Sequence, residues 1–219
     1  PEYWEMHFAR PSPLAAEYQR MVRSITESLQ FIEALTGGPI PGMNRVDFFT
    51  SHEGLHLHYE QAVTRQVPRR EGWYNLGTHF PWIGNRTRAL DGAHIEYFRG
   101  IRNPIAVKIG PPIQPEEVLA LCDALNPANE PGRLTLITRF GLACVARELP
   151  PLVQAVQSRE RRVLWVCDPM HGNTETTRTG IKTRRFERIL EELETTFQIL
   201  ADAGAHPGGV HFELTGDNV

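Results

Sequence analysis

Three short apolar runs between residues 105 and 167 decide the fold of this chain. They are Ile105–Ile109 (IAVKI), Leu134–Thr138 (LTLIT) and 163–167 (VLWVC). Runs of this length that are apolar almost throughout are typical of strands covered on both faces, as in parallel sheets. The two segments between them carry apolar residues at helical spacing. Strand, helix and strand in this order predict parallel βαβ units.

The same alternation extends in both directions along the chain. Toward the end, residues 186–200 carry the most regular helical stripe of the sequence, and 210–214 is a candidate strand. Toward the beginning, 46–50 is a fifth candidate strand, and helices are predicted over 11–35, 53–65 and 86–100. Five strands could complete a doubly wound sheet, whereas a (β/α)8 barrel needs eight.

The composition excludes several classes of protein. With 219 residues, 22% of them charged, and a net charge of −3, the chain has the size and balance of one globular domain. It has no basic excess for nucleic acid and no apolar run long enough to cross a membrane. Its three cysteines lack the spacing of a disulfide framework, which indicates a reducing compartment. We therefore expect neither a nucleic-acid nor a membrane partner.

Charged side chains gather where the predicted strands end, which is the edge at which parallel sheets place their sites. Lys108 and Arg139 belong to successive strands, which suggests that both hold one anionic ligand, a phosphate or a carboxylate. An internal salt bridge from Lys108 to Glu213 or Asp168 explains the same spacing, because an unpaired buried charge is costly. Both interpretations remain open at this point.

A histidine and a carboxylate lie near the ends of the last two predicted strands. His171 supplies an imidazole nitrogen and Glu213 a carboxylate oxygen, and both are suitable ligands for a divalent metal. Two ligands are too few for a complete site, and a lone histidine in a turn is more often a hydrogen-bonded turn residue. The residues alone leave both interpretations open.

All but two of the 23 basic residues are arginine, and the exceptions are Lys108 and Lys182. A lysine kept in this background suits a role that needs a compact point charge, although chance explains it equally well. Residues 78–88 are expected to form a polar, aromatic loop that opens a helix, and its N–H groups beside Arg86 suit a phosphate. Lys182 precedes another predicted helix, where positive charge indicates a nearby anion or a solvated flank.

One set of motifs is colinear over most of the chain, and its most specific member is WVCDPMHGNT at 165–174. The set resembles the class II 3-deoxy-D-arabino-heptulosonate 7-phosphate (DAHP) synthase family. The other members are TSHE at 50–53, WIGNRTR at 82–88, DGAH at 91–94, NP at 103–104 with Lys108, PGRLTL at 131–136 with Arg139, KTR at 182–184 and GGVHFELTG at 208–216.

The resemblance implies an α/β fold of the (β/α)8 TIM-barrel type, of which this chain would carry about five strand–helix units, the third to seventh strands. Residues 1–219 would then form a single catalytic-barrel domain, incomplete at both ends. Within it, 1–45 would be a helical connecting segment and 46–219 the barrel units. The implied activity is a transferase reaction that joins phosphoenolpyruvate and erythrose 4-phosphate and releases phosphate. This reaction is the first step of the shikimate pathway, which leads to the aromatic amino acids.

The resemblance also implies roles for individual residues. His171 and Glu213 match two ligands of a divalent metal, Mn2+, Co2+ or a similar ion, and the remaining ligands have no counterpart here. Lys108 and Arg139 match positions that hold phosphoenolpyruvate, and Arg86 matches a phosphate-binding position. Lys108 and His171 are the candidate catalytic residues.

Two further positions complete the candidate site. Lys182 matches a lysine at the mouth of the family's active site. Asn85 is also implied to bind substrate, although it stands where the family usually has an acidic residue; asparagine is tolerated there if only its backbone N–H is used. The resemblance further implies a homo-oligomer at full length, located in the cytoplasm of a bacterium or the plastid of a plant.

Two alternatives to this function remain open. The chain could be a non-catalytic fragment or relative of the family, or part of another metal-dependent aldolase-type barrel. The missing ligands and the open barrel lead us to expect that this polypeptide alone is inactive.

Overall fold

The computed structural model describes residues 13, 15–38 and 47–214 of the chain. The chain separates into two compact units, Pro1–Phe48 and Phe49–Val219. In the first unit, helix α1 (Ala15–Thr36) confirms most of the helix predicted over 11–35, whose first positions lie outside the described part. No helix within the described residues is long and apolar enough to cross a membrane.

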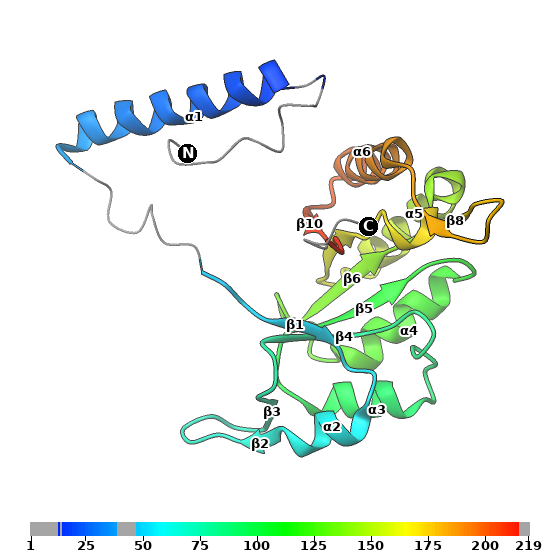
Figure 1. Ribbon diagram of the computed structural model, residues 1–219. Coiled ribbons are helices and arrows are strands. Elements are labelled where there is room, and N and C mark those ends of the chain that lie inside the picture. Colours follow the sequence, from blue (N-terminus) through cyan, green and yellow to red (C-terminus); the bar gives the residue numbers. More distant parts are fainter. Residues whose placement is uncertain (1–12, 14, 39–46, 215–219) are drawn as a thin grey trace. The chain divides into compact units, whose positions relative to one another are not determined.

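Six parallel strands form the central sheet of the second unit, in the spatial order β1-β4-β5-β6-β7-β10 (Figure 1). The spatial order follows the order along the chain without a reversal. A doubly wound sheet reverses its strand order, so this arrangement is compatible with part of a (β/α)8 barrel instead. The strands are β1 (Ser51–Glu53), β4 (Phe80–Ile83), β5 (Ile105–Ile109), β6 (Leu134–Thr138), β7 (Leu164–Cys167) and β10 (Pro207–Val210).

The main helices alternate with these strands and lie in one layer (Figure 1). Consecutive helices contact each other: α3 contacts α4, α4 contacts α5 and α5 contacts α6. This neighbour-to-neighbour packing places the helices on one face of the sheet, as around a barrel. They are α3 (Ala93–Gly100), α4 (Pro115–Leu125), α5 (Leu142–Ser158) and α6 (Phe186–Asp202). The smaller elements are α2 (Leu57–Ala62), the hairpin of β2 (Thr64–Gln66) with β3 (Trp73–Asn75), the hairpin of β8 (Glu175–Thr176) with β9 (Lys182–Thr183), and the 3-10 helix η2 (His171–Asn173).

The hydrophobic core lies between the sheet and this helix layer. Every residue of β5 and β6 is buried, as their apolar runs predict. Leu136 from the sheet and Leu121 and Leu149 from the helices are fully buried. Burying each such side chain stabilises the fold by roughly 1.5–3 kcal/mol. The packed sheet in turn holds the ends of its strands, and the polar residues that follow them, in fixed positions.

The first strand differs in position from the prediction. The strand predicted over 46–50 is wrong, because β1 begins only at Ser51. Phe48 and Phe49 are 88% and 71% exposed, so the apolar residues that suggested this strand lie outside the sheet. Position 46 is outside the described residues. The helix predicted over 53–65 is also shorter and covers only Leu57–Ala62.

One strand of the sheet is hidden in a segment that the sequence marks as a loop. The prediction of a loop over 78–88 is wrong in part, because β4 occupies Phe80–Ile83 and pairs with β1 and β5. Pro81 lies inside this strand, and proline normally argues against a central strand. The sheet therefore has six strands where the sequence indicates five. The helix predicted over 86–100 begins only at Ala93.

The last strand also lies earlier than predicted. The strand expected over 210–214 occupies Pro207–Val210 instead, beside β7. Gly208 permits this pairing, because a Cβ atom there would lie 2.3 Å from the Leu164 side chain. Glycines ordinarily mark turns in a sequence, so the pattern places this strand too late.

Candidate functional site

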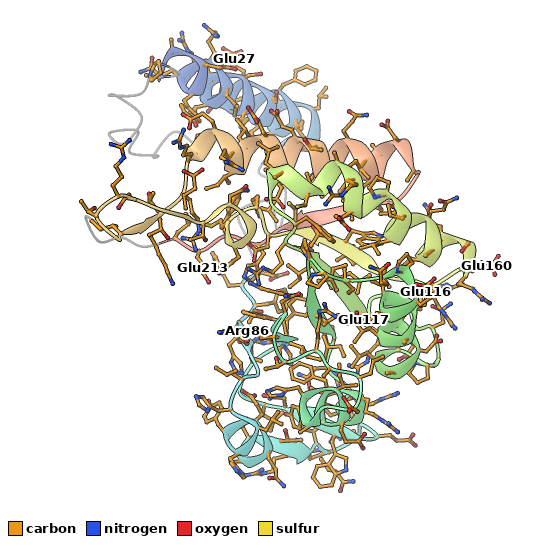
Figure 2. All side chains as sticks on the ribbon, turned by 90° about the vertical axis from the view of Figure 1, so that its right-hand side faces the viewer. Glu27, Arg86, Glu116, Glu117, Glu160 and Glu213 are labelled. Carbon is orange, nitrogen blue, oxygen red and sulfur yellow. The ribbon has the colours of Figure 1, made fainter. Side chains whose placement is uncertain are left out.

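The structure brings four of the predicted site residues to the carboxyl ends of neighbouring strands. Lys108 is on β5, Arg139 follows β6, His171 follows β7 and Glu213 follows β10. The Nε2 atom of His171 lies 3.0 Å from Oε1 of Glu213. Figure 2 shows Glu213 and also Arg86 beside this end of the sheet. The rule that parallel sheets place their sites at the carboxyl ends of their strands thus predicts the location of this cluster from the sequence alone.

Asp168 is the centre of this cluster. Its carboxylate is fully buried and accepts hydrogen bonds from Nζ of Lys108 at 2.7 Å and from Nδ1 of His171 at 2.7 Å. The backbone N–H groups of Met170 and His171 also donate to it. Burial raises the pKa of the Asp168 carboxyl, but the hydrogen bonds and charges of Lys108 and His171 outweigh burial and leave this pKa below its ordinary value.

Lys108 is buried in a polar and aromatic environment. Its side chain forms the internal ion pair with Asp168, which was one of the two interpretations open from the sequence. Its ammonium lies 4.3 Å from the centre of the Trp82 ring, within the range of a cation–π interaction. The ring of Trp82 meets that of His211 edge to face at 5.3 Å. The ammonium has three donors, so the ion pair leaves it able to bind an anion as well.

Arg139 connects the loops that follow β6 and β7. Its Nη2 atom donates to the backbone carbonyl of His171 at 3.2 Å. Its Nε atom is buried and has no hydrogen-bond partner among the described residues. A buried donor without a partner costs about 1–3 kcal/mol, so this atom is suited to receive an anionic ligand.

A second buried carboxylate holds these two loops together. Glu192 on α6 accepts hydrogen bonds from the backbone N–H groups of Phe140 and Gly141, at 3.1 and 2.8 Å. It also accepts one from Nδ2 of Asn173 at 2.6 Å. Burial raises the pKa of Glu192 to about 7, although these three hydrogen bonds act in the opposite direction. The loops that carry Arg139 and His171 are therefore tied to each other and to the helix layer.

The other predicted residues lie outside this contact network. Asn85 accepts a hydrogen bond from Nε of Arg88 at 3.2 Å, which occupies its side chain. Arg86 is exposed. Lys182 lies on the β8–β9 hairpin and is exposed, and within the described part of the chain its side chain forms no hydrogen bond or ion pair. The structure thus brings Lys108, Arg139, His171 and Glu213 together and leaves Lys182 apart.

The donor set at His171 and Glu213 fits part of a divalent metal site. Neutral imidazole and carboxylate together suit first-row transition metals. Neighbouring ligands about 2.1 Å from a cation lie about 3 Å apart when they are at right angles, and the two atoms here are 3.0 Å apart. Within the described residues, no group of three or more histidine, cysteine or acidic side chains could hold a metal. The two residues can therefore supply only a part of the coordination.

The structure adds three features of the cluster that the sequence leaves open or does not show: the shared contact of Asp168 with Lys108 and His171, the cation–π contact of Trp82, and the placement of His211. The pKa of His211 is lowered by burial and then by the nearby charge of Lys108. Asp168 belongs to the most specific motif, so the motif marks its importance without showing its partners. Cys167 in the same motif is buried with a pKa raised to about 12, and its thiol faces Thr196 of α6. It therefore lies on the helix side of the sheet.

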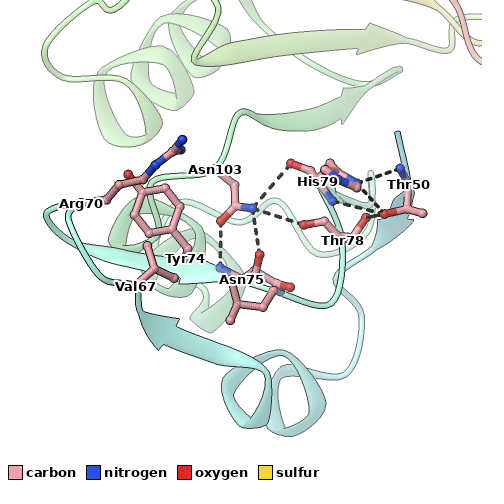
Figure 3. A pocket seen from close by; sticks show the side chains of 9 residues that line it. Thr50, Val67, Arg70, Tyr74, Asn75, Thr78, His79 and Asn103 are labelled. Carbon is pink, nitrogen blue, oxygen red and sulfur yellow. Dashed lines mark hydrogen bonds between the residues drawn. The ribbon is translucent and has the colours of Figure 1, made fainter. Parts of the chain in front are cut away.

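A separate cavity of about 320 Å³ lies at the opposite, amino-terminal end of the strands. Thr50, Tyr74, His79 and Asn103 are among its lining residues (Figure 3). The Asn103 amide bonds to Asn75 and to the backbone before β4, which satisfies its own groups. None of the predicted site residues lines this cavity, so it is distinct from the candidate site.

Comparison with known proteins identifies the family. The family model described as the class-II DAHP synthetase family matches residues 1–219. Proteins named phospho-2-dehydro-3-deoxyheptonate aldolase from Neurospora crassa and Streptomyces coelicolor are each 44% identical to the chain, over 99% of it and 48% of their own length. A relative of this name from Mycolicibacterium smegmatis is 43% identical, over 99% of the chain and 47% of the relative. The chain thus spans about half the length of these relatives. These matches show that the chain belongs to the class-II DAHP synthetase family.

Proposed function

We propose that the full-length protein containing this chain condenses phosphoenolpyruvate with erythrose 4-phosphate and water to form DAHP and phosphate. This is the first step of the shikimate pathway. Its family and the names of its relatives support this reaction. The observation that carries it is the convergence of His171 and Glu213, 3.0 Å apart, beside the buried pair of Lys108 and Asp168.

Phosphoenolpyruvate is the anionic ligand that this cluster suits best. The Lys108 ammonium keeps donors free beyond its bond to Asp168, and Arg139 has a buried Nε atom without a partner in the described structure. Both groups would bind the carboxylate and phosphate of this substrate and neutralise them. The exposed Arg86 would hold a second phosphate, with the backbone N–H of Asn85 beside it, and Lys182 would approach at the mouth of the site.

His171 and Glu213 would hold the divalent metal, Mn2+, Co2+ or a similar ion. When bound, the metal supplies Lewis-acid polarisation of the aldehyde carbonyl of erythrose 4-phosphate. The chain's own residues orient the substrates so that C3 of phosphoenolpyruvate faces the aldehyde carbon. A carbon–carbon bond forms there, water adds at C2, and the C–O bond to phosphate breaks. Lys108 and Arg139 hold the departing phosphate and the carboxylate during these steps.

This reaction is tested in the full-length protein by measuring phosphate release from phosphoenolpyruvate with and without erythrose 4-phosphate. We expect release only with both substrates and a divalent metal, and loss of release after chelation. His171→Ala should abolish metal-dependent turnover. Use of pyruvate in place of phosphoenolpyruvate, or condensation without phosphate release, would assign the protein to another class of aldolase-type enzyme. Insensitivity of His171→Ala and wild type to chelation would refute the metal site.

The cellular setting belongs to the same proposal. A homo-oligomer at full length, in the bacterial cytoplasm or a plant plastid, fits a biosynthetic enzyme of this family. Size-exclusion chromatography with light scattering of the full-length protein tests the oligomer directly.

A further inference from the structure

We propose that Asp168 is a positioning residue that serves both halves of the site at once. Its single carboxylate orients His171 toward the metal and holds Lys108 beside Trp82 for the anionic substrate. The proposal rests on the proposed function, because it assigns a role within that same site.

The histidine side of this role follows from hydrogen-bond chemistry. Nδ1 of His171 lies 2.9 and 2.7 Å from the two carboxylate oxygens of Asp168. An ionised carboxylate can only accept hydrogen bonds, so Nδ1 must carry the proton of the neutral ring. The Nε2 lone pair then points away from Asp168 toward Glu213, 3.0 Å away. Two lone pairs at this distance repel each other unless a proton or a cation lies between them, so Asp168 prepares the ring to bind a cation.

The lysine side follows from burial. Lys108 is 4% exposed and Asp168 is fully buried, with 2.7 Å between Nζ and Oδ2. Without this partner, the ammonium would be an uncompensated buried charge, and it would lose the contact that holds it above the Trp82 ring. Asp168 therefore compensates the buried charge of Lys108 and fixes its side chain in place before any substrate binds.

Replacing Asp168 with asparagine distinguishes a residue that positions His171 and Lys108 from a residue that only fills space in the core. Asp168→Asn keeps the size of the side chain, but an amide has one acceptor oxygen and turns an NH2 group toward at least one of two donors. Either His171 or Lys108 must then lose its partner. A packing residue would lower stability when replaced and leave the affinity for metal unchanged.

The experiment compares two buried carboxylates in the full-length protein. Asp168→Asn removes the proposed positioning group. Glu60→Gln is the matched control, because Glu60 is also buried and bonded to a histidine, His52 at 2.9 Å, in a different part of the fold. Mn2+ is titrated calorimetrically into metal-free protein, and thermal unfolding is followed without metal.

We expect Asp168→Asn to raise the Kd for Mn2+ about 10–100-fold and to raise KM for phosphoenolpyruvate. Glu60→Gln should lower thermal stability with little change in Mn2+ affinity. The double variant Lys108→Met with Asp168→Leu removes both buried charges and the side-chain acceptor for Nδ1 of His171, so it should be more stable to heat than Asp168→Asn and still bind Mn2+ weakly. This double variant keeps the test decisive if the single variant folds poorly.

Two outcomes would overturn the inference and leave the proposed function standing. Wild-type Mn2+ affinity in Asp168→Asn or in the double variant shows that His171 needs no carboxylate to orient it. Equal losses of affinity in Asp168→Asn and Glu60→Gln show a general structural effect. Failure of the wild-type protein itself to bind Mn2+ is distinguishable from both, because it removes the proposed metal-dependent function and this inference with it.

Discussion

Replacing Glu192 with glutamine tests whether a buried acid makes the stability of this fold depend on pH. Glu192 is fully buried, and its pKa is raised from an ordinary 4.5 to about 7 because burial disfavours the charged carboxylate. The folded state therefore binds this proton more tightly than the unfolded state. The resulting stabilisation is fully present below pH 4.5 and is lost as the pH rises through about 7.

The size of the effect follows from the same two values. A difference between 4.5 and about 7 corresponds to a loss of about 3 kcal/mol of unfolding free energy across this range. Glu192→Gln stays neutral and should not show this loss. Relative to wild type, the variant should therefore gain about 3 kcal/mol between pH 4.5 and pH 8.

Urea unfolding of both full-length proteins at several pH values measures this difference directly. Subtracting the two curves removes the contribution of every titrating group that does not interact with Glu192. Parallel curves over the whole range would show that Glu192 has the same pKa in the folded and the unfolded protein. The reasoning from burial would then be wrong, because the hydrogen bonds to Glu192 would fully offset the effect of burial.

Two further substitutions address the loops of the site. Gly141→Ala should destabilise the protein by about 1–3 kcal/mol. Residue 141 has a φ of 79°, and a Cβ atom there would lie 2.5 Å from the carbonyl oxygen of Gly172. An unchanged midpoint of thermal unfolding would contradict this packing. Arg139→Lys retains the charge but loses the planar group that reaches the His171 carbonyl. It should raise KM for phosphoenolpyruvate about tenfold or more, which steady-state kinetics of the full-length protein checks, and a wild-type KM would exclude Arg139 from binding.

The parts of the fold that the sequence predicts best are those in which burial alone determines the pattern. β5 and β6 occupy the predicted residues because every side chain in them is buried. β4 is not apparent from the sequence, because Pro81 lies in a short strand whose burial alternates. The position of β10 depends on the close approach of Gly208 to Leu164, which is a property of the packed chain.

The candidate site shows the same division. The rule that sites lie at the carboxyl ends of parallel strands places Lys108 and His171 together. The sequence leaves open whether Lys108 binds an anionic ligand or forms an internal ion pair. The distance between Nζ of Lys108 and the Asp168 carboxylate shows the ion pair, and this distance depends on the register between the strands. The contact with Trp82 likewise depends on a strand that the sequence does not mark.

The loops after β6 and β7 touch through their backbones, since a Cβ atom added at Gly172 would lie only 2.3 Å from the amide nitrogen of Gly141. Neither Gly141 nor Gly172 has a side chain at this contact that could absorb a shift of one loop relative to the other. Arg139 and His171 therefore belong to one rigid piece, and a displacement that reaches either loop is transmitted to both. Directed evolution of this protein would have to alter the two loops together, because a change that suits one loop alone would misalign the other.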